Sequence, residues 1–476
     1  MSELPDGWAS ATLAEAVEAD APIIYGILQP GPDIADGVPY VRPTEIVGDA
    51  IDMAALRRTT SQIAGRYRRS SLAAGDVLLS IVGTIGKVAV VPRELDGGNI
   101  TQSSCRIRPR RALTSNDIVA QFLRSPLARS QFEEARLGTA VPRLNLEDVR
   151  KFVMPMPPLP EQRRIVARID SLAGKSRRAR DHLDHIPRLV EKYKQAVLAA
   201  AFRGDLTREW RHDQQHPIPI SPRESSEIRR KFADTDNFVP PYIVPGPWRW
   251  LRLPQLGDLD RGKSRHRPRN DDRLFGGSHP FIQTGEVRQA HRYLTSYSET
   301  YSDFGLAQSR LWPVGTVCIT IAANIAETAI LGIDACFPDS VVGFLADASR
   351  ADASYVEFFL RTARGELEAF APATAQKNIN LDTLGSVRVP AAPIAEQREV
   401  VRRIEIAFTW IDRLASEATS ARRLIDRLDQ SVLAKAFRGE LLPQDPADEP
   451  ASVLLERIRA ERSAAPKAKR GRRAGA

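Results

Sequence analysis

Residues 393–441 read PIAEQREVVRRIEIAFTWIDRLASEATSARRLIDRLDQSVLAKAFRGEL, and residues 158–206 read PLPEQRRIVARIDSLAGKSRRARDHLDHIPRLVEKYKQAVLAAAFRGDL. Both stretches contain Glu-Gln-Arg near their start, at Glu161 and Glu396, and Ala-Phe-Arg-Gly near their end. Each anchor recurs 235 residues later, so no insertion separates the anchors in either copy. This internal repeat predicts the architecture, because two similar sequences are expected to fold in the same way.

Apolar side chains recur every seven residues within both copies. In the second copy one row holds Ile404, Ile411, Ala418, Ile425 and Val432, and another holds Ala407, Leu414, Ala421 and Leu428. The first copy has Ile169, Ser176, Leu183, Val190 and Val197, with Leu172, Ala179, Ile186 and Tyr193. Two such rows over four heptads are typical of a helix that packs on another helix. We expect two helices about 60 Å long, with a kink at Pro187 in the first.

The direction of packing follows from what precedes each helix. A globular region of about 150 residues lies ahead of each copy, and a parallel pair of helices would crowd both regions at one end. We therefore expect an antiparallel coiled coil with a pseudo-two-fold relation between the halves. The helices could simply hold the domains together, but their strict register favours a spacer of set length.

The globular regions repeat more faintly and read as mixed α/β. Short strands are expected at 77–81, 88–91 and 317–321, and helices at 117–124 and 355–361. The expected division of the chain is a first globular domain at 1–157, a long helix at 158–206, a linker at 207–243, a second globular domain at 244–392, a long helix at 393–443, and a C-terminal helix with a basic tail at 444–476.

Composition limits the class of protein. Lys and Arg number 68 against 59 Asp and Glu, a net charge of +9 over 476 residues, which leans weakly towards a polyanionic partner. Cys105, Cys318 and Cys336 are too few for a disulfide scaffold or a four-cysteine zinc site, and they fit a reducing cytoplasm. We expect no signal peptide, because MSELPDGWAS has no basic and no apolar stretch, and no apolar run approaches the ~18 residues that a membrane helix needs.

Three apparent catalytic motifs do not hold up. Gly257–Ser264 satisfies the P-loop string, but the basic, Pro-containing residues that follow cannot begin the packed helix that a P-loop requires. Val239-Pro240-Pro241-Tyr242 resembles an amino-methyltransferase motif, yet Val239 cannot accept a hydrogen bond from a target amine. His182 with His185, and His212 with His216, lack further ligands at metal spacing. We expect no catalytic residues and no metal site in this chain.

Basic clusters are present in both globular regions instead. Such side chains neutralise phosphates, and Arg, Asn and Gln can read base edges, although solvated surface charge explains any single residue equally well. The candidate DNA-binding residues are Arg66, Arg68, Arg69, Thr84, Lys87, Gln102, Arg106, Arg108, Lys263, Arg265, Arg267, Asn324, Gln376, Lys377 and Asn378.

The whole arrangement resembles the specificity subunit of a type I restriction–modification system. The resemblance rests on Leu4-Pro5-Asp6-Gly7-Trp8, on Gly75–Leu78 before Gly83–Lys87, on the two copies quoted above, and on 448–458 (DEPASVLLERI). It covers nearly the whole chain, and the doubled Glu-Gln and Ala-Phe-Arg-Gly anchors make it specific. Ala395 departs from the pattern, because the first copy has Pro160 there.

The resemblance implies a mechanism. Each globular domain is expected to be a target recognition domain that reads one part of a split double-stranded DNA site. Partner subunits would do the chemistry. Two methylation subunits would carry S-adenosylmethionine, and a motor–nuclease subunit would use ATP and Mg²⁺. Three alternatives stay open. The chain could itself be a DNA-methylating or ATP-using enzyme through Gly257–Ser264, it could serve a combined cleavage–methylation enzyme, or it could be a scaffold that does not read DNA.

Overall fold

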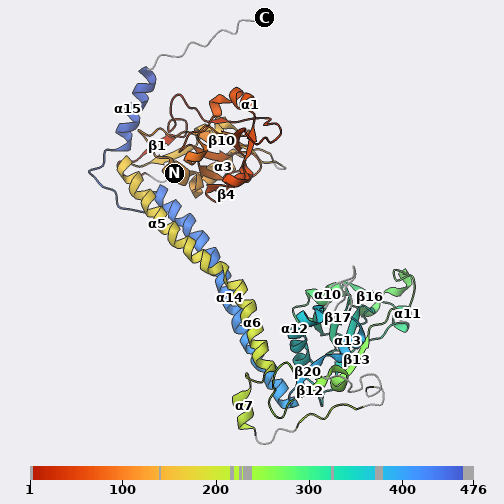
Figure 1. Ribbon diagram of the computed structural model, residues 1–476. Helices are drawn as coiled ribbons and strands as arrows, with labels where there is room; N and C mark the ends of the chain where they lie inside the picture. The colour runs from red at the N-terminus through yellow and green to blue at the C-terminus, as the bar shows by residue number, and fades with distance from the viewer. Residues whose placement is uncertain are drawn as a thin grey trace. The chain divides into compact units, whose positions relative to one another are not determined.

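The computed structural model describes residues 4–138, 141–214, 219–224, 228, 238–322, 326–369 and 379–464. Its contacts divide the chain into two compact units, Met1–Asp184 with Thr419–Ala476 (unit 1) and His185–Ala418 (unit 2). Each unit contains a mixed α/β domain and parts of the long helices (Figure 1). The mixed α/β prediction is confirmed.

Unit 1 is built on a four-stranded antiparallel sheet in the order β2 (Ile24–Tyr25), β10 (Ser104–Ile107), β7 (Val77–Ser80) and β8 (Val88–Val90). All four residues of β7 and β10 are buried. Helix α2 (Asn116–Arg124) packs beside β7 and β8, and its N-cap Ser115 accepts a hydrogen bond from the Ile118 amide. The remaining elements are β1 (Ala9–Thr12), β3 (Val38–Val41), β4 (Ile46–Val47), β5 (Ala50–Ile51), β6 (Arg57–Thr59), β9 (Asn99–Ile100), β11 (Val153–Met156), α1 (Ser61–Arg66), α3 (Pro126–Ala135), α4 (Leu146–Lys151) and the 3-10 helices η1 (Pro43–Glu45), η2 (Met53–Ala55), η3 (Arg68–Ser70) and η4 (Arg93–Leu95).

Unit 2 repeats this plan around a five-stranded sheet in the order β13 (Gly257–Arg261), β19 (Val341–Ala346), β17 (Val317–Thr320), β18 (Thr328–Leu331) and β15 (Tyr293–Leu294). Helix α12 (Ala353–Ala369) packs on β18, in the place that α2 takes in unit 1. The expected strands and helices of both domains are therefore present. Its other elements are β12 (Arg249–Arg252), α9 (Leu253–Leu256), η5 (Asp272–Leu274), β14 (Phe275–Phe281), α10 (Thr284–Gln289), β16 (Glu299–Tyr301), α11 (Asp303–Ala307), α13 (Leu381–Ser386) and β20 (Arg388–Ala391).

One strand pair links each domain to its long helix. In unit 1 β1 pairs antiparallel with β11, and helix α5 (Leu159–Asp184) begins three residues after β11 ends. In unit 2 β12 pairs with β20 in the same way, and helix α14 (Ile394–Phe437) follows β20. The first strand of each domain thus meets the last one, which brings the start of the domain to the root of the helix.

The predicted kink in the first copy is confirmed as a break. Helix α5 ends at Asp184, and helix α6 (Ile186–Phe202) begins after His185, with Pro187 in its first turn. Proline lacks the amide hydrogen that a helix interior requires, but it is tolerated in the first turn. Arg422 occupies the equivalent position of the second copy, and α14 runs through 44 residues without interruption.

Within each unit the long helices run antiparallel. In unit 1 the Ser176 hydroxyl donates to Asp429 at 2.7 Å, the Arg180 guanidinium contacts Asp426 at 2.9 Å, and Asp184 pairs with Arg422. In unit 2 Lys194 pairs with Asp412 at 2.6 Å, and Arg403 donates to the Leu206 carbonyl at 2.7 Å. Residue numbers rise along one helix as they fall along the other, so the antiparallel prediction is correct in both units.

One of the two predicted rows of side chains is wrong in part. The row that contains Ile404 does face inward, because that side chain is fully buried. The second row is mixed, because Ala407 and Ala421 are partly buried, whereas Leu414 is 59% exposed, Leu428 56% and Tyr193 61%. The positions one residue further along also face inward, and among them Ala415, Arg422 and Asp429 are partly buried.

The physical reason is that the true second row is partly charged. Arg422 and Asp429 of α14, like Arg180 and Lys194 of the first copy, form ion pairs across the helix pair. A search for apolar residues passes over such positions. Ser176, the one polar break in the expected first row, is 7% exposed and hydrogen-bonded to Asp429, so the break is a polar contact.

The segments outside the domains are also partly structured. Helix α7 (Arg208–Asp213) and the buried Ile220 lie inside the stretch 207–243 that was predicted to be a linker. Helix α15 (Ala451–Ala464) confirms the expected C-terminal helix. It packs against β1 through buried Leu455 and Ile458, and the Ala451 amide donates to the Gly7 carbonyl at 2.8 Å. In the part of the chain that the structure describes, no helix is both long and apolar enough to cross a membrane.

Candidate nucleic-acid interface

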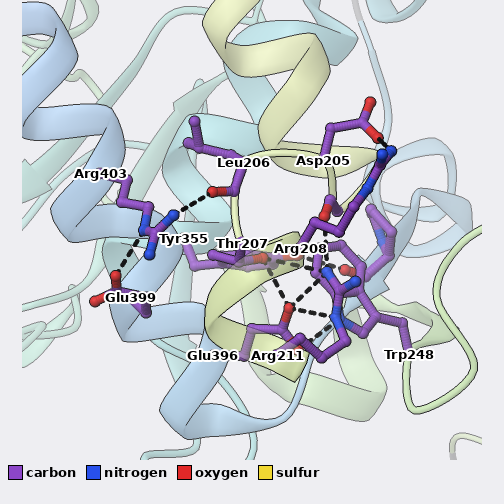
Figure 2. Close-up of polar contacts among 12 residues, drawn as sticks. Asp205, Leu206, Thr207, Arg208, Arg211, Trp248, Tyr355, Glu396, Glu399 and Arg403 are labelled. Atoms are coloured by element: carbon purple, nitrogen blue, oxygen red, sulfur yellow. Dashed lines mark hydrogen bonds and ion pairs between the residues drawn. The ribbon is translucent and has the colours of Figure 1, made fainter. Parts of the chain in front are cut away.

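The Glu-Gln anchors fasten each long helix to its own domain. In unit 2 Glu396 is completely buried and accepts hydrogen bonds from Trp248 at 2.9 Å, Thr207 at 2.8 Å and Arg211 at 2.8 Å (Figure 2). In unit 1 Glu161 accepts a hydrogen bond from Trp8 at 3.0 Å. We call each tryptophan–glutamate pair with its neighbours a joint.

The glutamines beside these glutamates complete the joints. The Gln162 amide donates to the carbonyls of Leu113 and Pro157, both at 3.0 Å, in unit 1. The Gln397 amide donates to the carbonyls of Ala392 at 2.8 Å and Arg350 at 2.9 Å in unit 2. The sequence reveals these residues as a motif, but their role in orienting the helix relative to the domain becomes visible only in the structure.

Three loops of unit 1 meet at one end of the β7–β8 hairpin. They are the glycine turn 82–86, the turn 101–103 and the segment before Leu144, of which 136–138 and 141–143 are described. The Ser103 carbonyl accepts from the Ile81 amide at 2.9 Å, the Ile81 carbonyl accepts from Leu144 at 2.9 Å, and the Pro142 carbonyl accepts from Gly83 at 2.9 Å. We call this the loop end of unit 1. Loops at one end of a rigid sheet are a common place for binding residues.

Unit 2 has the same backbone arrangement. The Ile321 amide donates to Ser340 at 3.0 Å, and the Ile379 amide donates to the Ile321 carbonyl at 3.0 Å. Four predicted DNA contacts are close to Ile321 or Ile379 in the sequence but lie outside the described residues. They are Asn324, Gln376, Lys377 and Asn378. The prediction that they bind DNA stays a prediction.

Five of the predicted residues of unit 1 are exposed. Thr84 and Gln102 lie on two of the three loops of the loop end. Arg66, Arg68 and Arg69 lie in α1 and η3, and η3 packs beside β2. Two residues after β2, the Ile27 carbonyl accepts from the Gln102 amide at 3.0 Å, so β2 leads from the neighbourhood of η3 to the turn 101–103. This arrangement could place basic groups at phosphates beside a group of polar side chains.

Burial corrects the expectation for Arg106. Its side chain is 3% exposed, and its guanidinium donates to the carbonyls of Ser71 at 3.2 Å and Pro22 at 3.1 Å. Burial also lowers the pKa of this guanidinium. Arg106 therefore holds two loops to the sheet and presents no group to DNA.

Arg108 and Lys87 are engaged within the domain as well. Arg108 makes two hydrogen bonds of 2.7 Å to the buried carboxylate of Asp76, and these bonds raise the pKa of Arg108. The Lys87 ammonium donates to the carbonyls of Pro43 at 2.8 Å and Ile46 at 2.9 Å. Both cations fasten segments that are distant in sequence. The sequence prediction misses this structural role, because a charged residue does not reveal its partner in the sequence.

The basic loop of unit 2 is partly exposed. Lys263 lies 3.8 Å from Asp260, and the Arg267 guanidinium donates to the carbonyls of Ser264 and His266. Arg265 is exposed, and among the described residues it has no polar partner. The structure thus leaves Arg265 available to a phosphate, while the other two are tied to their own loop.

The P-loop string is a strand and not a nucleotide site. Residues Gly257–Arg261 form β13, paired antiparallel with β19, and no helix follows. At Gly262 an added Cβ would lie 2.3 Å from the Phe337 carbonyl oxygen, so this glycine serves close packing. Among the described residues no group of three or more His, Cys, Asp or Glu side chains could hold a metal ion.

Comparisons with known proteins also find two repeated regions in the chain. Residues 18–180 and 245–414 match the family model for the type I restriction modification DNA specificity domain. The chain is 30% identical to the specificity subunit of the type I restriction enzyme EcoBI of Escherichia coli over 223 residues, which is 47% of this chain and 46% of that one. It is 23% identical to the StySPI specificity subunit of Salmonella potsdam over 97% of this chain and 96% of that one.

Solved structures share the fold. The HsdS subunit from Thermoanaerobacter tengcongensis superposes with a TM-score of 0.60 at 22% identity, covering 92% of this chain and 98% of that one. A chain from a study of the assembly and conformational transition of a type I restriction–modification system gives a TM-score of 0.66 at 22% identity, covering 93% of this chain and all of that one. The family model matches well over half of the sequence, in two copies that coincide with the two domains, and this chain therefore belongs to the family of type I restriction–modification DNA specificity subunits.

Proposed function

We propose that this chain reads a bipartite, asymmetric site on double-stranded DNA, with one domain reading each part. The observation that carries the proposal is the contrast within each copy. The joints and helices repeat closely, whereas the loops beside them differ in sequence between the two copies. Shared joints would present both domains in the same way, and different loops would read different bases.

The long helices would act as a spacer between the two parts of the site. Their anchors are separated by the same number of residues in both copies. A helix rises about 1.5 Å per residue, so a fixed residue count gives a fixed length. In this proposal the helices determine the gap and the domains determine the bases.

Partner subunits would supply the chemistry. We propose that two methylation subunits carry S-adenosylmethionine and flip the target adenine, and that a motor–nuclease subunit uses ATP and Mg²⁺. An exposed apolar row supports a partner on the helices, since Ile406, Trp410 and Leu414 of α14 in unit 2 are 46%, 61% and 59% exposed at intervals of four residues. The chain itself would have no catalytic role, and it would act in the cytoplasm, where chromosomal DNA and these partners meet.

The decisive experiment compares adenine methylation in the genomic DNA of the host with and without this gene, by single-molecule sequencing. The proposal predicts that deletion removes one asymmetric two-part motif. Replacing residues 1–150 with those of a relative should then change one half of that motif. If both halves change, the modular reading is wrong.

A second experiment, on the purified complex, separates the alternatives. If deletion changes no methylated motif, the chain is purified with its methylation partner and tested for sequence preference in DNA binding. Absence of any preference would favour a scaffold. Cleavage by a single partner that both methylates and cuts would favour a combined cleavage–methylation enzyme.

A further inference from the structure

Arg143 lies at the centre of the loop end of unit 1 and was not among the residues expected to bind DNA. Its backbone amide and carbonyl each bond to Leu137 at 2.9 Å, and the same residue bridges to Val82 of the glycine turn. The segment before β11 and α4 is thereby held on both sides. Arg143 itself is exposed, and among the described residues its side chain has no polar partner.

Backbone alternation fixes the direction of these side chains. Successive side chains of an extended segment point to opposite faces. Leu144 is 3% exposed and enters the core, so Arg143 points away from the core. Val141, two residues earlier, is 62% exposed.

The loop end gathers side chains that suit base edges. Gln102 is exposed on the neighbouring turn, and Leu28, which follows Ile27 beside that turn, is 47% exposed. Arginine binds guanine through two hydrogen bonds, glutamine binds adenine in the same way, and apolar side chains contact the thymine methyl group. A set of exposed apolar, amide and guanidinium groups on rigidly bonded loops has the chemistry of direct readout.

Charge also favours DNA as the occupant of this surface. The described residues of the three loops, 82–86, 101–103, 136–138 and 141–143, contain two arginines and no acidic residue. Arg136 pairs with Glu133 of α3 at 3.2 Å, which leaves Arg143 as the cation of these loops without a described acidic partner.

We propose that Arg143 is a specificity-determining residue that reads a base edge, most suitably guanine, in the part of the site recognised by unit 1. Gln102 reads a neighbouring base, and Leu28 and Val141 exclude water around them. This inference rests on the proposed function, because it assumes that unit 1 reads DNA.

The test uses Arg143→Ala and Arg143→Lys in the full chain, expressed with its methylation partner, and reads the methylated motif by single-molecule sequencing. The control is Arg93→Ala, because Arg93 is also exposed but lies near the opposite end of the β7–β8 hairpin, where the Gly75 amide bonds to Val91. Arg143→Ala should relax one base position in one half of the motif, with discrimination falling about 10- to 100-fold. Arg143→Lys should recover only part of it, because lysine cannot form the paired contact, and Arg93→Ala should leave the motif unchanged.

Other outcomes overturn the assignment in distinct ways. A wild-type motif from Arg143→Ala shows that Arg143 reads no base. Uniformly weaker binding to all sequences, with the melting temperature of the purified variant unchanged, makes Arg143 a phosphate contact and not a reader. If Arg143→Ala fails to fold, Arg143→Met keeps most of the side-chain volume, and an unaltered motif from that variant overturns the proposal. Absence of any two-part motif with the wild-type chain is a failure of the proposed function instead.

Discussion

The two joints use the same tryptophan and glutamate but satisfy the carboxylate differently. In unit 2 both oxygens of Glu396 accept hydrogen bonds, from Trp248, Thr207 and Arg211. In unit 1 Trp8 binds one oxygen of Glu161, and the other is buried without a hydrogen-bond partner. Unit 1 instead ties its helix through Arg164, which pairs with Asp448 at 2.6 Å. The repeated motif therefore determines where each long helix is anchored to its domain. The residues that follow the helices determine how strongly that anchor is held.

The largest expected effect separates the joints directly. Glu396→Ala should destabilise unit 2 by about 3–5 kcal/mol, because it leaves the Arg211 cation and two further donors unpaired in a buried site. Glu161→Ala should cost unit 1 less, about 1–3 kcal/mol, since one hydrogen bond is removed. Urea unfolding of the two variants, followed by regional hydrogen exchange, measures both. Equal losses in the two units would contradict the comparison.

The second prediction concerns the phase of the helix pair. Ile404→Ala should cost about 2–4 kcal/mol, because a fully buried side chain leaves a cavity. Leu414→Ala should change the stability of the isolated chain by less than about 0.5 kcal/mol, because that side chain is 59% exposed. Thermal melts of the purified variants test this. A large loss from Leu414→Ala would restore the row that the sequence indicated. Weaker binding of the methylation partner by Leu414→Ala would add support to the proposed docking row.

The third prediction tests the difference between the joints through the pH dependence of stability. Burial is the main cause that raises the pKa of Glu161, while the Trp8 hydrogen bond opposes it. A carboxyl whose pKa is higher in the folded state favours folding at low pH, and this contribution is lost as pH rises through the folded-state pKa. Glu161→Gln should therefore flatten the fall in the stability of unit 1 as pH rises above the ordinary glutamate pKa of about 4.3. Urea midpoints across that range provide the measurement, and an unchanged pH dependence in the variant would contradict the assignment.

The smallest effect per residue concerns the exposed arginines of α1 and η3. Replacing Arg66, Arg68 and Arg69 together by alanine should weaken DNA binding for all sequences. The slope of log K against log salt should become shallower by up to about 0.9 for each phosphate that these arginines neutralise in the wild-type chain. The methylated motif should stay the same, because these residues would contact phosphates and not bases. A changed motif would assign them to readout, and an unchanged slope would leave them as solvated surface.

The candidate site divides in the same way between what a sequence reveals and what it conceals. Thr84 and Gln102 were predicted from residue type and lie on neighbouring loops, whereas Arg143 was passed over because nothing in its local sequence marks it. Residue type alone predicts Arg106 and Arg108 to be surface cations that bind DNA. Their partners, Pro22 and Asp76, are 84 and 32 residues away, so only the folded chain shows that these charges are engaged.

The sequence by itself determined the repeated plan, the two long helices, the break before Pro187 and the short strands of both domains. These features depend on local periodicity and backbone chemistry, and both are written within a few residues of each position. Only the tertiary structure decided which face of α14 meets its partner, because that face carries Arg422 and Asp429, whose partners Asp184 and Ser176 lie more than 230 residues away. Charge neutralised across a helix pair resembles solvated charge in a sequence, and the pairing that distinguishes them exists only once the chain has folded.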